Sequence, residues 1–204
     1  MYTVADINKR KATLADEVDD AELVVQVASG NRRAFNRVLS RHLNAILSFS
    51  MRYVRQRSDA EDIAQETFTR LWLHAKRLKA KPHSLRSWLY RVAYNLCMDW
   101  YRKDKYDSLD DADGAFACEE TPETYAMNST EQAMIHSAVG TLPERQRTAL
   151  WLCAYHGLTN KEAAEIIGTS IHALESILAR ARRTLRQTMN EQQLNRSSEY
   201  DETG

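Results

Sequence analysis

An acidic segment without helical periodicity separates two parts of the chain that have it. Residues 106–130 contain seven Asp or Glu, no Lys or Arg, one Gly, one Pro and no apolar stripe. On either side, residues 20–105 and 131–190 carry apolar side chains at the three- and four-residue spacing of amphipathic helices. Strand-like alternation nowhere extends beyond a few residues. The sequence therefore predicts an all-α fold, with two small helical bundles joined by an acidic linker.

The distribution of charge agrees with this division. The chain has 28 basic and 28 acidic residues, yet residues 20–105 hold 17 Lys or Arg against 8 Asp or Glu. Residues 1–19 and 191–204 are polar, and we interpret them as an N-terminal and a C-terminal tail. Because salt screens charges beyond about 8 Å, the basic first bundle suits a polyanionic partner even though the net charge is zero.

Membrane and secreted proteins do not fit this sequence. The longest uninterrupted apolar run is the seven residues Ala149–Tyr155, whereas a membrane-spanning helix needs about 20. The N-terminus lacks the basic and apolar regions of a secretory signal. Cys97, Cys118 and Cys153 are odd in number and far apart, so they predict no disulfide framework. We expect a cytoplasmic protein with no membrane contact of its own.

Local signals predict where several helices begin and end. Asp19 is a candidate N-cap for the first helix. Three capping boxes, in which a Ser or Thr is followed three residues later by Glu, begin at Ser58, Thr141 and Thr159. A final helix is predicted from about Ser170 to Met189.

Residues 159–181 have the pattern of a helix-turn-helix. A short helix over 160–167 is followed by a turn at Gly168 and by a longer second helix. In such a motif the outward residues at the front of the second helix meet base edges in the major groove, and arginines further along suit phosphates. The alternative is an ordinary helical hairpin with solvated arginines.

A second candidate nucleic-acid surface lies on the helix predicted over 85–103. One face carries Trp88, Arg91, Asn95 and Arg102, a combination suited to single-stranded nucleic acid, since rings stack on bases and arginines follow the backbone. A basic loop precedes it. The alternative is that Trp88 and Trp100 are core residues, and the pattern alone does not decide.

Three stretches together resemble a known family. They are DAEDIAQETFTRLW at 59–72, LRSWLYRVAYNLCMDWYRK at 85–103, and LPERQRTAL at 142–150, which runs into the helix-turn-helix. In this order they resemble the bacterial RNA polymerase sigma factors of the extracytoplasmic-function (ECF) class. The resemblance covers about residues 20–105 and 131–188. It implies that the first bundle is region 2, which binds core polymerase and reads and melts the −10 promoter element, and that the second is region 4, which reads the −35 element.

The resemblance also implies roles for individual residues. Candidates for docking on the clamp helices of the largest polymerase subunit are Asp62, Gln65 and Glu66. Candidates for the −10 element are Lys79, Lys81, Arg86, Trp88, Arg91, Asn95, Arg102 and Lys103. Candidates for the −35 element are Ser170, His172, Ala173, Glu175, Ser176, Arg180 and Arg182. Many members carry basic residues where this chain has Glu175 and Ile177, so the exact −35 sequence does not follow from the resemblance.

Further partners are implied by the same resemblance: promoter DNA, the flap of the polymerase and an anti-sigma factor. No cofactor, metal ion or catalytic residue is expected. The linker is either a solvated spacer or an acidic strand that lies along a basic channel of the polymerase.

Two competing functions are considered beside the sigma factor. One is a stand-alone helix-turn-helix regulator whose N-terminal bundle serves as a sensor or dimerisation module. The other is an enzyme or metalloprotein. Cys153 and His156 have a metal-like spacing, but no second pair of ligands accompanies them.

Overall fold

The computed structural model describes residues 18–54, 56–78, 84–107, 135 and 137–201. Within these ranges every regular element is a helix, as the sequence predicted. Residues 1–17 of the expected N-terminal tail and 108–130 of the expected linker lie outside the described residues. None of the described helices is both long and apolar enough to cross a membrane.

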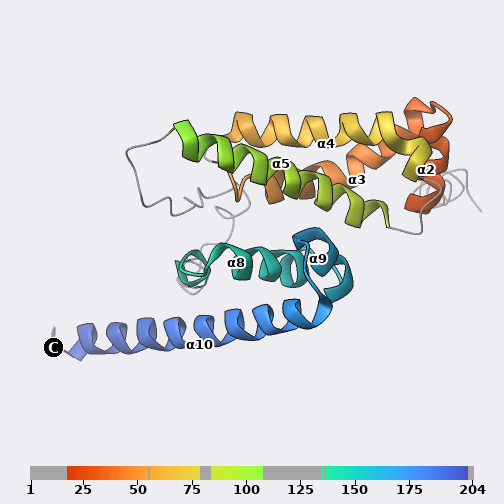
Figure 1. The fold of residues 1–204 in the computed structure, drawn as a ribbon. Helices are drawn as coiled ribbons and strands as arrows, with labels where there is room; N and C mark the ends of the chain where they lie inside the picture. The colour runs from red at the N-terminus through yellow and green to blue at the C-terminus, as the bar shows by residue number, and fades with distance from the viewer. Residues whose placement is uncertain (1–17, 55, 79–83, 108–134, 136, 202–204) are drawn as a thin grey trace, which may run out of the picture.

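In the described residues, the N-terminal bundle has four helices, with bounds α2 Asp20–Ala28, α3 Arg32–Ser50, α4 Arg57–Leu78 and α5 Leu85–Asp107. Figure 1 shows α4 and α5 side by side, with α2 across one end. The apolar stripes of these helices meet in one core, whose fully buried members include Leu23, Val38, Phe49, Leu71 and Leu89. Burying such stripes drives the helices together.

The C-terminal bundle contains α8 Glu144–Leu150, η1 Trp151–Tyr155, α9 Asn160–Ile167 and α10 Ile171–Asp201. The segment η1 is a π-helical turn, in which the backbone N–H of His156 donates to the carbonyl of Trp151 at 2.8 Å. Such turns add a residue to the helix and redirect the side chains that follow. Here the turn sends His156 into the interior.

The helix boundaries test the predicted caps. Thr159 forms the predicted capping box with Glu162. The box predicted at Ser58 is wrong, because α4 already begins at Arg57. The box predicted at Thr141 is also wrong, since Pro143 occupies the N-cap of α8 and the Thr141 hydroxyl donates to a carbonyl behind it.

The last helix is longer than predicted. It was expected to end near Met189, before a polar tail over 191–204, but α10 continues to Asp201 (Figure 1). Residues 190–201 contain no Gly or Pro and are rich in Gln, Glu and other residues that tolerate a helix. Nothing in that stretch stops the helix, so polarity alone was a poor guide to its end.

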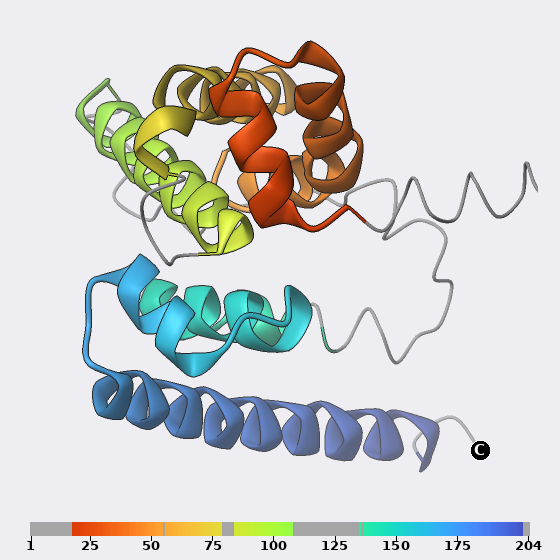
Figure 2. The ribbon, with the colours of Figure 1, turned by 90° about the vertical axis from the view of Figure 1, so that its right-hand side faces the viewer.

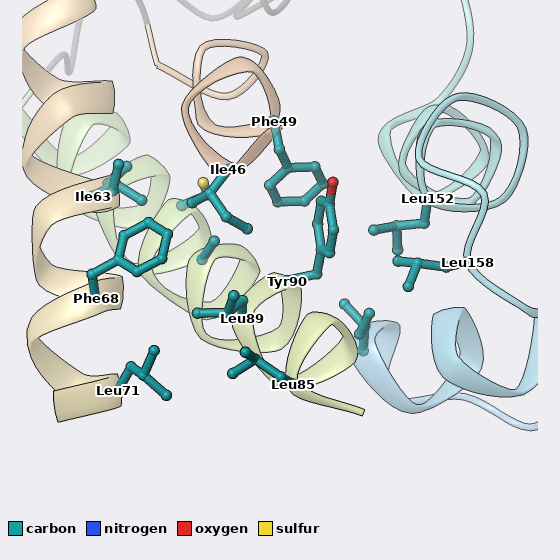
Figure 3. Close-up of a cluster of buried hydrophobic side chains, with 14 of the residues drawn as sticks. Ile46, Phe49, Ile63, Phe68, Leu71, Leu85, Leu89, Tyr90, Leu152 and Leu158 are labelled. Carbon is teal, nitrogen blue, oxygen red and sulfur yellow. The ribbon is translucent and has the colours of Figure 1, made fainter. Parts of the chain in front are cut away.

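The two bundles pack against each other. Helix α5 contacts α9, and one buried cluster runs continuously through both bundles. Figure 2 shows the C-terminal bundle as a layer against the N-terminal one, with α10 on the far side. In Figure 3, Leu152 and Leu158 of the C-terminal bundle lie beside Tyr90 of α5. The sequence predicts two bundles but not this contact.

Candidate nucleic-acid and polymerase interfaces

One face of α5 presents the side chains expected to meet nucleic acid. Arg91 and Asn95 are exposed and one turn apart. Trp88, one turn before Arg91, is half-buried and packs against the core. One portion of its side chain therefore lies against the core, and the rest remains open to solvent.

The same face continues to the end of the described side chains of α5. Arg102 is exposed and bridges to Asp99, while its Nε donates to the carbonyl of Met98 at 3.3 Å. Lys103 is exposed beside it. The candidates Lys79 and Lys81 lie outside the described residues.

Arg86 does not join this face. It lies two residues before Trp88, on another side of the helix, and is only partly exposed. A Cβ placed on Gly157 of the C-terminal bundle would come within 3.8 Å of the Arg86 Nη2 atom. In this conformation Arg86 therefore faces the other bundle.

The helix-turn-helix has the predicted geometry. Gly168 ends α9 in the left-handed conformation, with φ of 72°, which Gly adopts without steric cost. The Ser170 hydroxyl accepts from the backbone N–H of Ala173 at 3.1 Å and so caps α10. Ala164 and Leu174 are buried where the two helices meet.

The front of α10 is open to solvent. Of the seven candidates for the −35 element, Ala173 is half-buried and the other six are exposed. The exposed six are Ser170, His172, Glu175, Ser176, Arg180 and Arg182. Figures 1 and 2 show α10 along the outer edge of the bundle, where a groove of DNA can reach it. The Oε2 atom of Glu175 lies 3.9 Å from Nδ1 of His172. Glu175 is the one acidic residue among these seven candidates.

The candidate polymerase-docking residues lie on α4. Asp62 and Gln65 are exposed, and the half-buried Glu66 accepts from Arg70 at 2.7 Å. Asp62 and Glu66 are four residues apart, so both carboxylates point the same way. This acidic surface can complement a basic helical partner.

Two family models match the chain in the places where these surfaces lie. Sigma-70 region 2 matches residues 38–106, which include most of the N-terminal bundle. Sigma-70 region 4 matches residues 132–185, which include the helix-turn-helix. The RNA polymerase sigma factor CnrH of Cupriavidus metallidurans is 31% identical over 81% of this chain and 92% of its own length. The chain belongs to the ECF RNA polymerase sigma factors.

Other relatives support the same assignment. The ECF sigma-E factor of Haemophilus influenzae is 29% identical over 83% of this chain and 94% of its own. Among solved structures, CnrH in complex with the cytosolic domain of CnrY has a TM-score of 0.63 at 28% identity, covering 84% of this chain and 97% of that one. The sigma factor RpoE of Bartonella quintana, in complex with the anti-sigma factor NepR, has the same TM-score at 26% identity, covering 76% and 96%.

As an ECF sigma factor, the protein binds core RNA polymerase and directs it to promoters. The family models cover both bundles, so a stand-alone regulator with an unrelated N-terminal module is not favoured.

An apolar groove beside the docking residues was not predicted from the sequence. It lies between α3 and α4 of the sigma factor, encloses about 570 Å³, and is lined by Phe35, Leu39, Leu43, Leu47, Gln65 and Phe68 among others. Leu43 is 38% exposed. The width of the apolar stripe on α3 could have indicated this groove. Val38, Ile46 and Phe49 already fill the core, so Leu39, Leu43 and Leu47 remain for a second apolar surface.

No metal centre is built from the described residues. Among them, no group of three or more His, Cys, Asp or Glu is placed to hold a metal ion. The Cys153 thiol lies 3.8 Å from the Asn160 carboxamide oxygen, and His156 bonds to Tyr90 at 2.8 Å. The two residues with metal-like spacing therefore have separate partners.

Proposed function

We propose that the two DNA-contacting surfaces of this sigma factor divide the promoter between them. The exposed face of α5 reads the −10 element and holds the separated strand, and the front of α10 reads the −35 element. The observation that carries this proposal is the alignment of Trp88, Arg91 and Asn95 along one open face of α5. An unpaired base gains roughly 1–3 kcal/mol by stacking on such a ring.

Docking on polymerase is assigned to α4. The Asp62 and Gln65 side chains are exposed next to the groove between α3 and α4, so charge complementarity and apolar burial act on one surface. A basic amphipathic helix of the partner fits such a surface.

An anti-sigma factor is proposed as a further partner. The solved structures of CnrH and of RpoE are complexes, with the cytosolic domain of CnrY and with the anti-sigma factor NepR. Purification from the native host is expected to yield this chain together with a small protein. Recovery of the chain always alone or only on polymerase contradicts this part of the proposal.

The protein is proposed to act by binding rather than by catalysis, in the cytoplasm where polymerase works. The matches to sigma-70 regions 2 and 4 support this proposal, and the proposed steps need only contacts to DNA and polymerase.

The decisive experiment is run-off transcription with purified core polymerase on genomic fragments, including the promoter of its own gene. Permanganate footprinting of unpaired thymines then follows strand opening. Asn95→Ala and Trp88→Ala are expected to reduce opening roughly tenfold each, as the loss of about 1.4 kcal/mol of base contact requires. Arg33→Ala, an exposed arginine on α3 outside both surfaces, is the matched control.

Two outcomes contradict the proposal. One is wild-type opening by both α5 variants. The other is tight footprinting of a palindromic duplex by the isolated chain without polymerase, which supports the stand-alone regulator instead.

A further inference from the structure

A cavity lies between α3, α5 and the end of η1. It encloses about 450 Å³, within the roughly 300–1,000 Å³ that small-molecule sites span. Arg41 of α3 and Arg86 of α5 line it, whereas Trp88, Arg91 and Asn95, which are proposed to contact DNA, do not. The cavity is therefore separate from the nucleic-acid face of α5.

The ring of His156 lines this cavity and has one nitrogen without a partner. The residue is only 6% exposed. Its Nδ1 atom shares a hydrogen bond of 2.8 Å with the Tyr90 hydroxyl, whereas its Nε2 atom is buried and has no hydrogen-bond partner among the described residues. Leaving a buried polar atom unpaired is unfavourable, so a ligand that satisfies Nε2 gains from this contact.

Arg86 determines which kind of ligand atom Nε2 can meet. Its guanidinium hydrogen-bonds to the Tyr90 hydroxyl, and because an arginine can only donate, the phenol oxygen accepts this bond. The proton of the phenol is then available for Nδ1 of His156. A neutral imidazole that accepts at Nδ1 carries its own proton at Nε2. The unpaired atom is therefore an N–H donor, which needs an acceptor.

The charges around this ring favour a negative acceptor. Burial, and then the positive charges of Arg52 and Arg86, lower the pKa of His156 from 6.5 to about 3. Surroundings that disfavour a proton on the ring stabilise a negative group beside it. A carboxylate or phosphate oxygen meets both requirements, since it accepts hydrogen bonds and carries negative charge.

Two carboxylates near the cavity have other partners. Asp20 lies 3.2 Å from Arg41 and so offsets the charge of that arginine. Glu162 is close enough to Arg86 for their charges to interact, but hydroxyl groups donate to both of its carboxylate oxygens. Arg86 is therefore the cation best placed to pair with a ligand.

We propose that this cavity binds a small organic anion, whose carboxylate or phosphate oxygens pair with Arg86 and accept from the Nε2–H of His156. Ile46 and Leu89 form an apolar part of the wall, and the ring of Tyr155 is 53% exposed. The body of the ligand is accordingly apolar or aromatic. The inference does not depend on how the two promoter surfaces act.

The tautomer of His156 gives the first test. In the free full-length chain labelled with ¹⁵N, two-bond correlation spectra of the imidazoles distinguish the two tautomers, and His156→Gln identifies the signal among the six histidines. We expect the Nε2–H form at neutral pH. Tyr90→Phe, which removes the hydroxyl bonded to Nδ1, is expected to shift the ring toward a mixture of tautomers. A wild-type ring with its proton at Nδ1 overturns the proposal.

Titration with defined probes gives the second test. Benzoate and phenyl phosphate are the anions, benzamide is the neutral control, and acetate lacks the ring; all are compared at constant ionic strength. Benzoate or phenyl phosphate is expected to shift the His156 Nε2–H resonance and to bind at least about tenfold more tightly than benzamide, because charged hydrogen bonds are the stronger ones. The tighter of the two anions identifies the preferred acidic group. No saturable shift, equal binding of benzamide, or equal binding of acetate contradicts the proposal.

A pair of arginine variants shows where the anion binds. Arg86→Gln is expected to weaken binding of the preferred anion at least about tenfold, since a charge-assisted bond is lost, and to leave binding of benzamide unchanged. Arg33→Gln, which changes the net charge equally at an exposed position of α3 outside the cavity, is the matched control. Circular dichroism verifies that both variants are folded. Undiminished binding by Arg86→Gln, or an equal loss in Arg33→Gln, overturns the proposal; if Arg86→Gln does not fold, the wild-type titration alone decides.

Discussion

The hydroxyls of Tyr53 and Thr148 lie 2.8 Å apart, although 95 residues separate them in the sequence. Burial raises the pKa of Tyr53 well above its ordinary value, so this phenol stays protonated and remains a donor. Both partners are enclosed in the contact between the bundles. The contribution of this hydrogen bond to stability therefore measures part of the energetic coupling between the two bundles.

A double-mutant cycle measures that coupling. Tyr53→Phe and Thr148→Val should each reduce the free energy of unfolding by about 1–3 kcal/mol, because each leaves a buried hydroxyl without its partner. The loss for the double variant should be smaller than the sum of the two single losses by about 1 kcal/mol. Urea denaturation followed by circular dichroism provides the values, and strict additivity would show that the bond contributes nothing.

A second prediction concerns pH. The pKa of His156 falls from 6.5 to about 3, because burial disfavours the charged ring and because Arg52 and Arg86 lie close to it. Tyr90, whose hydroxyl bonds to the ring, has a pKa raised to about 12 by burial and is uncharged in this range. Between those two pKa values, an unfolded chain takes up a proton that the folded chain does not bind.

The stability contributed by neutral His156 is therefore complete above pH 6.5 and is lost as the pH falls toward 3, at up to about 1.4 kcal/mol per pH unit. Between pH 6.5 and 5 we expect the wild type to lose about 1–2 kcal/mol more than His156→Gln, which keeps a hydrogen-bonding side chain but cannot titrate. Urea midpoints across this range test the difference. Parallel pH profiles for the two proteins would contradict it.

These two sites show where sequence reasoning succeeds and where it stops. The helical periods, the αL turn at Gly168 and the box at Thr159 depend on residues a few positions apart, and all were predictable. Tyr90 and His156 are 66 positions apart in the sequence, and they meet only because the two bundles pack against each other. No local pattern in the sequence predicts that these two side chains meet.

Local patterns also misled in identifiable ways. Ser58 and Thr141 have the composition of capping boxes, but α4 begins one residue earlier than its box and Pro143 replaces the other cap. Arg86 is basic and adjacent to the nucleic-acid face, yet its helical phase turns it toward Gly157. The sequence identifies which residues are charged, whereas helical phase and tertiary packing decide which surface each charged side chain points toward.

A third prediction concerns the cysteines. Burial raises the pKa of the Cys97 thiol to about 12, although Ser50 hydrogen-bonds to it. Since the thiolate is the reactive form, alkylation of Cys97 at pH 8 should be about 10³-fold slower in the native protein than in urea. The half-buried Cys153, whose pKa burial also raises, should react sooner than Cys97. Mass spectrometry of iodoacetamide-treated protein resolves the two sites, and rapid native labelling of Cys97 would refute the prediction.

The last prediction concerns Glu175, the acidic side chain at the front of α10. If the carboxylate mainly repels phosphates, Glu175→Gln in the reconstituted holoenzyme should tighten promoter binding by about 2–5-fold at low salt, and the gain should shrink as salt rises. Glu191→Gln is the matched control on the same exposed helix, about 24 Å along it at 1.5 Å per residue and so beyond the screening length. Fluorescence anisotropy at roughly 50 and 200 mM salt, a range over which phosphate contacts lose much of their affinity, measures the effect. Weaker binding by Glu175→Gln on a single promoter sequence would show instead that Glu175 accepts a hydrogen bond from a base such as cytosine.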